Sequence, residues 1–176
     1  MALMKLRTCC SRGEIITMVV FAIDPGNVFS AFAVVGDDYK VYHKEKCENE
    51  AILGWMKTLK VDVVVIERVA SYGMPVGREV FDTCEWIGRF TQVATDLALP
   101  VEYIFRIEEK MAICHSQHAG DANIRRALID RFARQDIKNG KGTKKEPDFF
   151  YGFKADMWAA FAVAYTYIEK TKEKVI

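Results

Sequence analysis

The segment that decides the fold is VVFAIDPGNVFSAFAVVGD, residues 19–37. Two apolar runs rich in valine, alanine and phenylalanine flank a Pro-Gly-Asn turn, and Asp24 closes the first run. Short apolar runs separated by turn residues predict strands, and the tight turn predicts that the strands pair antiparallel. A charged residue at the end of a buried strand is costly unless something binds it. Asp24 is therefore a candidate functional residue, with a turn-capping role as the alternative.

The composition indicates one globular domain. The chain has 176 residues and is 51% hydrophobic, which is enough to build a sizeable core. The 25 lysines and arginines nearly balance the 24 aspartates and glutamates, so any surface that binds nucleic acid must be local. We expect residues 1–17 to be a variable, poorly ordered extension and residues 18–176 to form a single domain.

The cysteines and the apolar runs indicate the cellular compartment. The five cysteines are odd in number and show no CxxC spacing, which favours reduced thiols in a cytoplasm over zinc sites or disulfides. The apolar runs are far shorter than the roughly 18 residues that a membrane-spanning helix needs. The sequence therefore predicts a cytoplasmic protein with no membrane partner.

Hydrophobic periodicity predicts five strands and five helices. The strands are expected at residues 19–24, 30–35, 39–46, 61–67 and 101–105, and the helices at 49–59, 78–97, 107–116, 122–134 and 154–172. Residues 136–146 are polar, basic and glycine-containing, which predicts a flexible loop. The order of elements predicts an α/β fold: a five-stranded mixed sheet, its first three strands antiparallel, flanked by helices on both faces.

Three carboxylates are expected to converge in this fold. Asp24 and Glu67 end two strands that should lie side by side in the sheet, and Asp156 opens the last, strongly apolar helix. Carboxylates that converge without matching lysines repel each other, and a hard cation such as Mg²⁺ relieves the repulsion. Glu67 could instead pair with Arg68 or Arg78, and Asp156 could simply favour the helix dipole.

Three motifs in this order resemble a known group of nucleases. They are AIDPG (22–26), VVVIE (63–67) and KADMWAAFAVA (154–164). Together they resemble the RNase H-like superfamily, and in particular the RuvC-like Holliday-junction resolvases of the phage type. The segments IERVASYGMPVGREVFDT (66–83) and GDANIRRALIDRF (120–132) are similar to the phage-type group as well.

The resemblance covers about residues 18–169 and implies an RNase H-like fold and a nuclease activity. It implies a structure-selective endodeoxyribonuclease with two Mg²⁺ ions per active site, for which Mn²⁺ can substitute. By the same resemblance Asp24 is shared by both ions, Glu67 holds one and Asp156 holds the other. It also implies a homodimer that binds a four-way DNA junction and needs no nucleotide cofactor.

One position departs from the pattern of the family. RuvC-like enzymes usually carry a fourth metal-site residue one helical turn before the late aspartate, and here that position is Phe153. Phenylalanine cannot bind a metal ion. Asp148 or Glu146 could reach the site instead, or a water molecule could fill the gap.

The expected DNA contacts lie in two loops and near two helices. The segment KNGKGTKK, residues 138–145, places lysines in a flexible loop, which suits phosphate contacts but is also typical of a solvated surface loop. Tyr72 and Met74 could wedge into a branch point or simply cover the following helix. The candidates for DNA contact are Tyr72, Arg78, Lys138, Lys141, Lys144, Lys145 and Lys154.

Three other functions fit part of this pattern. The first is a YqgF-like nuclease that processes structured RNA. The second is a catalytically weak protein of the same fold that binds DNA junctions. The third, an actin-like or sugar-kinase-type ATP binder, is the least favoured because the chain is too short for the two domains that it would need.

Overall fold

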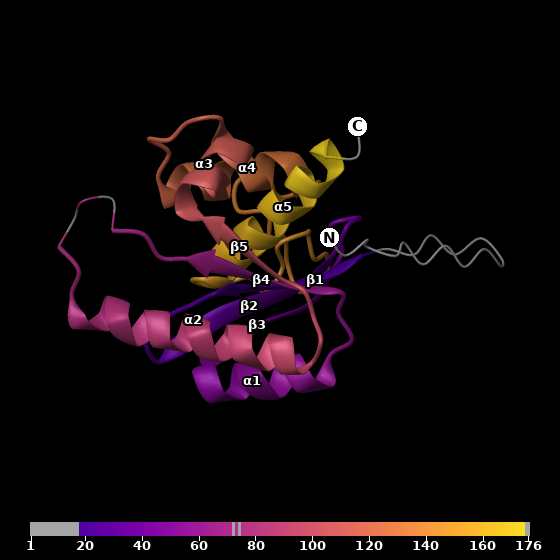
Figure 1. The fold of residues 1–176 in the computed structure, drawn as a ribbon. Helices are drawn as coiled ribbons and strands as arrows, with labels where there is room; N and C mark the ends of the chain where they lie inside the picture. Colours follow the sequence, from indigo (N-terminus) through magenta and orange to yellow (C-terminus); the bar gives the residue numbers. More distant parts are fainter. Residues whose placement is uncertain (1–17, 72, 74, 175–176) are drawn as a thin grey trace.

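The computed structural model describes residues 18–71, 73 and 75–174 (Figure 1). The expected extension at residues 1–17 and the two loop residues Tyr72 and Met74 lie outside these described residues. The strands are β1 (Val19–Asp24), β2 (Phe29–Gly36), β3 (Val41–Glu48), β4 (Val63–Arg68) and β5 (Val101–Phe105). The helices are α1 (Asn49–Thr58), α2 (Arg78–Asp96), α3 (Arg106–Cys114), α4 (Asp121–Phe132) and α5 (Met157–Glu173).

The five strands form one mixed sheet in the order β3-β2-β1-β4-β5. β1 pairs antiparallel with β2, and β2 pairs antiparallel with β3. β4 runs parallel to both β1 and β5. This topology confirms the predicted α/β fold, and it places β1 at the centre of the sheet.

Helices cover both faces of the sheet (Figure 1), with α1 and α2 on one side and α3, α4 and α5 on the other. Successive side chains of β1 point alternately to the two faces of the sheet, so this strand contributes to both hydrophobic cores. Phe21 and Ile23 belong to the core beneath α1 and α2, whereas Val20 and Ala22 belong to the core beneath α5. Asp24 continues the phase of Val20 and Ala22, so its side chain lies on the face that α5 covers.

α5 is apolar almost all round because it packs on β1 and β2 and is flanked by α3 and α4. Among the described residues, no helix combines the length and the apolar character that crossing a bilayer requires. β3 runs two residues later than predicted because Tyr39 adopts a left-handed conformation, with φ 66°, in the turn that precedes it. The amide of Tyr39 donates to the carbonyl of Gly36 and closes that turn.

The loop between α4 and α5 is more ordered than its composition predicts. Asp136 accepts hydrogen bonds from the amides of Asn139, Lys141 and Gly142. Gly142 has φ +65°, and a Cβ atom there would lie 2.3 Å from the carbonyl oxygen of Glu146. The glycine is therefore required by the turn, and the loop is organised by its own side chains rather than by a helix or strand.

Candidate active site

Two carboxylates lie next to each other at the end of the central strands. Asp24 is the last residue of β1, and Glu67 lies near the end of β4. The parallel register pairs Ile23 with Ile66, so the residues that follow them, Asp24 and Glu67, are neighbours on the same face. The predicted convergence of these two strand ends follows from the topology of the sheet.

The two carboxyl groups perturb each other strongly. Burial raises the pKa of Asp24 to about 8, and the charge of Glu67 and a hydrogen bond between the two side chains contribute to this shift. Asp156 adds to the shift and Arg106 opposes it. Burial also raises the pKa of Glu67, with Arg106 again opposing. Near neutral pH, and with no cation bound, the pair therefore retains a proton.

Asp156 lies at the same end of the sheet, immediately before α5, and already has a partner. Its Oδ2 atom is 2.5 Å from Nζ of Lys46 on β3, and its side chain is 47% exposed. Ala31 of β2 pairs with Asp24 of β1 on one side and with Lys46 of β3 on the other. Lys46 and Asp24 therefore lie two strands apart on the same face of the sheet, with only the small side chain of Ala31 between them. The sequence predicts three converging acids that lack lysine partners. The structure corrects this for Asp156.

Asp24 and Glu67 form a pair and Asp156 lies apart from it, so the three carboxylates are not arranged as a complete metal site. Within the part of the chain that the structure describes, no three His, Cys, Asp or Glu side chains already form a group that could hold a metal ion. Asp24 and Glu67 are in contact with each other, and Asp156 is held by Lys46.

Three further charged residues surround the pair, and sequence reasoning missed all of them. Arg106 opens α3, and its Nη1 atom donates to Oε2 of Glu109 at 2.5 Å. Arg106 also pairs with Asp121, at the start of α4. Burial raises the pKa of Glu109 well above its ordinary value, and the charge of Glu67 adds to this. The i, i+3 spacing of an arginine and a glutamate just after β5 was the available signal, but it is common on exposed helices.

Phe153 packs in the core. It is fully buried, and its ring contacts those of Phe150, Trp158 and Phe161. Nζ of Lys44 lies 4.7 Å from the centre of the Phe153 ring. Phe153, at the position where the resemblance implied a departure from the family pattern, therefore stabilises the approach to α5 by aromatic packing.

The contacts of Asp148 argue against the metal-binding role that the sequence left open for it. Its carboxylate accepts hydrogen bonds from the backbone amides of Arg134, Gln135, Asp136 and Phe149. These bonds hold the pKa of Asp148 well below its usual range. Asp148 organises the loop. Glu146, the other alternative, is exposed in the same loop.

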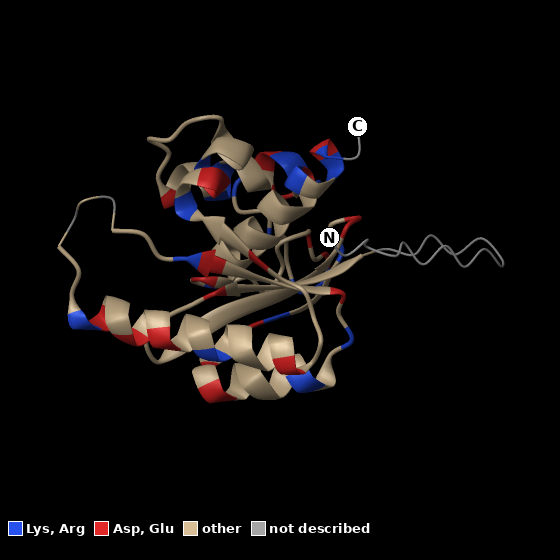
Figure 2. Ribbon diagram, in the orientation of Figure 1, with Lys and Arg blue, Asp and Glu red and all other residues tan. Residues whose placement is uncertain are grey.

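The predicted DNA-contact residues fall on different sides of the molecule. Lys138 lines a cavity of about 490 Å³ with Arg125 and Arg126 of α4 and Trp158 of α5. Arg78 opens α2, on the other face of the sheet, where its side chain is 93% exposed. Lys141 is half-buried, whereas the other three are exposed: Lys144, Lys145 and Lys154. Figure 2 shows acidic and basic segments interspersed over the helices, in keeping with the near-zero net charge.

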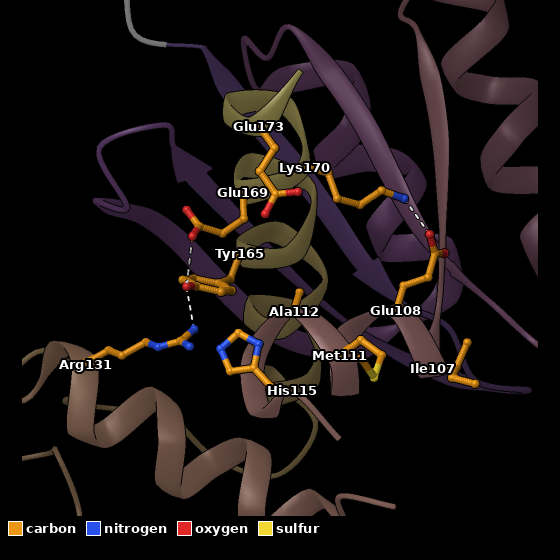
Figure 3. Close-up of a pocket in the computed structure, with 10 residues that line it drawn as sticks. All are labelled: Ile107, Glu108, Met111, Ala112, His115, Arg131, Tyr165, Glu169, Lys170 and Glu173. Carbon is orange, nitrogen blue, oxygen red and sulfur yellow. Dashed lines mark hydrogen bonds and ion pairs between the residues drawn. The ribbon is translucent and has the colours of Figure 1, made fainter. Parts of the chain in front are cut away.

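A second cavity, of about 540 Å³, lies between α3 and α5 and is separate from the acidic pair (Figure 3). In it, Arg131 donates to the hydroxyl of Tyr165, and Nζ of Lys170 lies 2.5 Å from Glu108. Neither Asp24, Glu67 nor Asp156 lines this cavity. α3 therefore separates two environments, one that contains Glu108 and one that contains Glu109.

Comparison with known proteins identifies the fold. The sequence matches no protein-family model, and no curated protein is similar enough in sequence to match it. The structure of Thermus thermophilus RuvC superposes with a TM-score of 0.67 and 18% identity, covering 89% of this chain and 97% of that one. The structure of T. thermophilus RuvC in complex with a Holliday junction substrate gives a TM-score of 0.66 and 16% identity, covering 89% and 96%. The chain therefore has the RNase H-like fold of RuvC, as the sequence resemblance implied.

Proposed function

We propose that this protein is a metal-dependent, structure-selective endonuclease that hydrolyses phosphodiester bonds in branched DNA such as Holliday junctions. The observation that carries the proposal is the buried pair of Asp24 and Glu67 at the ends of β1 and β4, in a fold shared with RuvC. The phage-type resemblance, the homodimer and a cytoplasmic location belong to the same proposal.

The chemistry of the donors fits a divalent cation. Among the described residues, Arg106 is the one cation whose charge acts on both Asp24 and Glu67, and it is itself paired with two other acids. Asp24, Glu67 and Asp156 would hold two Mg²⁺ ions, or Mn²⁺ in their place, because hard cations prefer carboxylate oxygens. When bound, such ions supply an activated water at neutral pH and stabilise the leaving oxygen.

The residues of the chain have defined tasks in this proposal. Asp24 has to lose the proton that its raised pKa retains, and Asp156 has to separate from Lys46. Lys46 is then free to contact a phosphate of the bound strand. Lys138 and the two exposed lysines of the α4–α5 loop, Lys144 and Lys145, are proposed to bind the DNA backbone, where contacts weaken with salt.

A surface for dimerisation is also proposed, on α2. This helix buries Ile87, Phe90 and Ala94 against the sheet but leaves Phe81 61% exposed. In this proposal the Phe81 side chain lies in the contact between the two protomers. Two active sites in a homodimer would allow paired cuts in two strands of a junction.

A second candidate function is supported by one observation. Phe153 is buried in an aromatic cluster, and Asp156 is held by Lys46, so the site has fewer available carboxylates than the family pattern implies. A protein that binds junctions but cleaves them weakly would have the same features. Processing of structured RNA by a YqgF-like activity is the remaining alternative.

The test is cleavage of a labelled synthetic four-way junction in Mg²⁺ or Mn²⁺. The wild type should produce paired, symmetrical nicks that Asp24→Asn and Glu67→Gln both lose. Asp130→Asn is the matched control, because Asp130 lies on the exposed side of α4 and pairs with Arg126. Tight binding without nicks in either metal would favour the second candidate, and neither binding nor cleavage would redirect the proposal to structured RNA.

A further inference from the structure

Glu109 is a completely buried carboxylate, and one of its oxygens has no hydrogen-bond partner in the described part of the chain. Its side chain is 0% exposed. Oε2 accepts a hydrogen bond from Arg106, but Oε1 is buried and has no hydrogen-bond partner among the described residues. A buried unpaired carboxylate oxygen is destabilising, and native proteins contain few of them. The unsatisfied oxygen therefore requires a specific explanation.

The location of Glu109 supplies that explanation. β5 pairs with β4 so that Ile104 lies beside Glu67, and α3 starts directly after β5, at Arg106. Glu109 is one helical turn further along. The charges of both Glu67 and Asp24 act on its carboxyl group. Glu109 thus belongs to the same buried acidic group as the proposed metal ligands.

The balance of charge around this group is incomplete. Within the part of the chain that the structure describes, three carboxyl groups, Asp24, Glu67 and Glu109, share one nearby positive charge, the guanidinium of Arg106. Arg106 in turn also pairs with Asp121. The described residues do not already form a metal site with three ligands. Buried carboxyl groups that share one positive charge would nevertheless be stabilised in their charged form by a divalent cation.

We propose that Glu109 is a further carboxylate of the metal centre, contributed by α3, and that it offsets the absence of a carboxylate at the position of Phe153. Arg106 is then a positioning residue, because it holds Oε2 and leaves Oε1 available to a hard cation. This inference rests on the proposed function in one respect, namely that Asp24 and Glu67 bind a divalent cation.

The experiment is titration of the metal-free full chain with Mn²⁺, followed by calorimetry and by the electron paramagnetic resonance of free Mn²⁺. Glu109→Gln should weaken Mn²⁺ binding by roughly 10- to 100-fold. Glu108→Gln is the matched control, because Glu108 is the preceding residue of α3 but pairs with Lys170 at the other cavity (Figure 3). Its affinity for Mn²⁺ should stay within about twofold of the wild type.

Thermal unfolding in EDTA separates a metal role from a structural one. If Glu109 served only as the partner of Arg106, Glu109→Gln would lower the melting temperature and leave the Mn²⁺ affinity unchanged, which would overturn the inference. If Glu109 binds the metal, the variant should gain less stability from Mn²⁺ than the wild type does, whether or not the loss of the pair with Arg106 lowers its melting temperature in EDTA. Should Glu109→Gln fail to fold, Glu109→Asp, which retains the charge but is shorter, should show the same loss of Mn²⁺ affinity.

The outcomes distinguish this inference from the proposed function. A wild type that binds no Mn²⁺ overturns both. Mn²⁺ binding that depends on Asp24 but not on Glu109 overturns only the inference. Mn²⁺ binding that depends on both residues, in a protein that neither binds nor cuts junctions, supports the inference and refutes the proposed substrate.

Discussion

Asp24 and Asp148 are two largely buried aspartates with opposite surroundings. The carboxylate of Asp148 is enclosed by four backbone amides, which lower its pKa well below the ordinary value. The carboxyl of Asp24 is enclosed by apolar strands and other acids, and burial and Glu67 raise its pKa to about 8. One negative charge is balanced inside the fold, and the other needs a proton or an external cation. The comparison separates an acid that stabilises the fold from an acid that we propose binds a cation.

The largest expected difference between the two acids is in the rate of junction cleavage, measured after each is exchanged for its amide. Asp24→Asn should reduce junction cleavage by at least about 1,000-fold, because the proposed shared metal ligand is lost. Asp148→Asn should leave cleavage per folded molecule nearly unchanged. The measurement is single-turnover nicking with saturating Mn²⁺. Equal losses in the two variants would show that the loop and the strand end act as one site.

The same two substitutions should change the stability of the metal-free protein in opposite directions. Asp148→Asn should lower the melting temperature by several degrees, because an amide cannot accept all the backbone hydrogen bonds of the carboxylate. Asp24→Asn should stabilise the metal-free protein at pH 8 by about 1–2 kcal/mol, because it removes a buried charge. Calorimetry in EDTA checks both. Destabilisation by Asp24→Asn would mean that its charge is already balanced in the fold.

The contributions of Asp24 and Asp148 to stability should depend on pH in opposite ways. The folded pKa of Asp24 is raised from 3.8 to about 8, so its contribution to stability is present below about pH 4 and is lost as the pH rises to 8. The folded pKa of Asp148 is lowered from 3.8, so its contribution is present above about pH 4 and is lost in acid. Denaturant titrations of the metal-free protein from pH 3 to pH 8 measure this. The difference between Asp24→Asn and wild type should grow with pH, and a constant difference would contradict the assignment.

A smaller effect is expected at the ion pair between Lys46 and Asp156. The pair is partly exposed and is worth up to about 1 kcal/mol, so its loss should strengthen Mn²⁺ binding by up to about fivefold. Lys46→Met tests this by calorimetry, with Lys57→Met on α1 as the control. Weaker Mn²⁺ binding in Lys46→Met would show instead that the lysine holds Asp156 in its binding position.

The smallest effect concerns the loop that Asp148 organises. Exchange of Lys144 and Lys145 for glutamine should lower the slope of log affinity for DNA against log salt by about 2, because each lost phosphate contact removes nearly one released counterion. The control is the same double exchange at Lys57 and Lys60, beside α1. Fluorescence anisotropy with a labelled junction at several salt concentrations gives the slope. An unchanged slope would leave these lysines as solvated surface groups.

Much of the fold could be predicted from the sequence, because its signals are local. The β-branched runs of β1 and β4 and the apolar character of α5 are visible in single segments, and the order of elements then fixes the sheet. Asp24 and Glu67 could be paired because parallel strands end at the same edge. These are inferences from periodicity and topology, which require no knowledge of individual side-chain contacts.

The rest of the site depends on contacts that no local pattern encodes. Lys46 and Asp156 meet across the sheet from distant parts of the chain, so the sequence shows no sign of the pair. In the sequence, Arg106 and Glu109 have the i, i+3 spacing of an ordinary ion pair on a helix surface. Their position beside β4 follows only from the packing of β5 and α3. The sequence left Asp148 as a possible metal ligand, because the backbone amides that its carboxylate binds come together only in the folded loop.

The position of α5 has a consequence for the timing of activity during synthesis. Asp24 and Glu67 lie in the first part of the chain, whereas Asp156 immediately precedes α5, which packs on β1 and β2. Contacts between distant segments form late, because the ribosome must first release both partners. A nascent chain therefore carries three of the four proposed ligands, Asp24, Glu67 and Glu109, but lacks Asp156 until α5 has been made and has docked. The order of the elements along the polypeptide would itself delay the proposed nuclease activity until folding is complete.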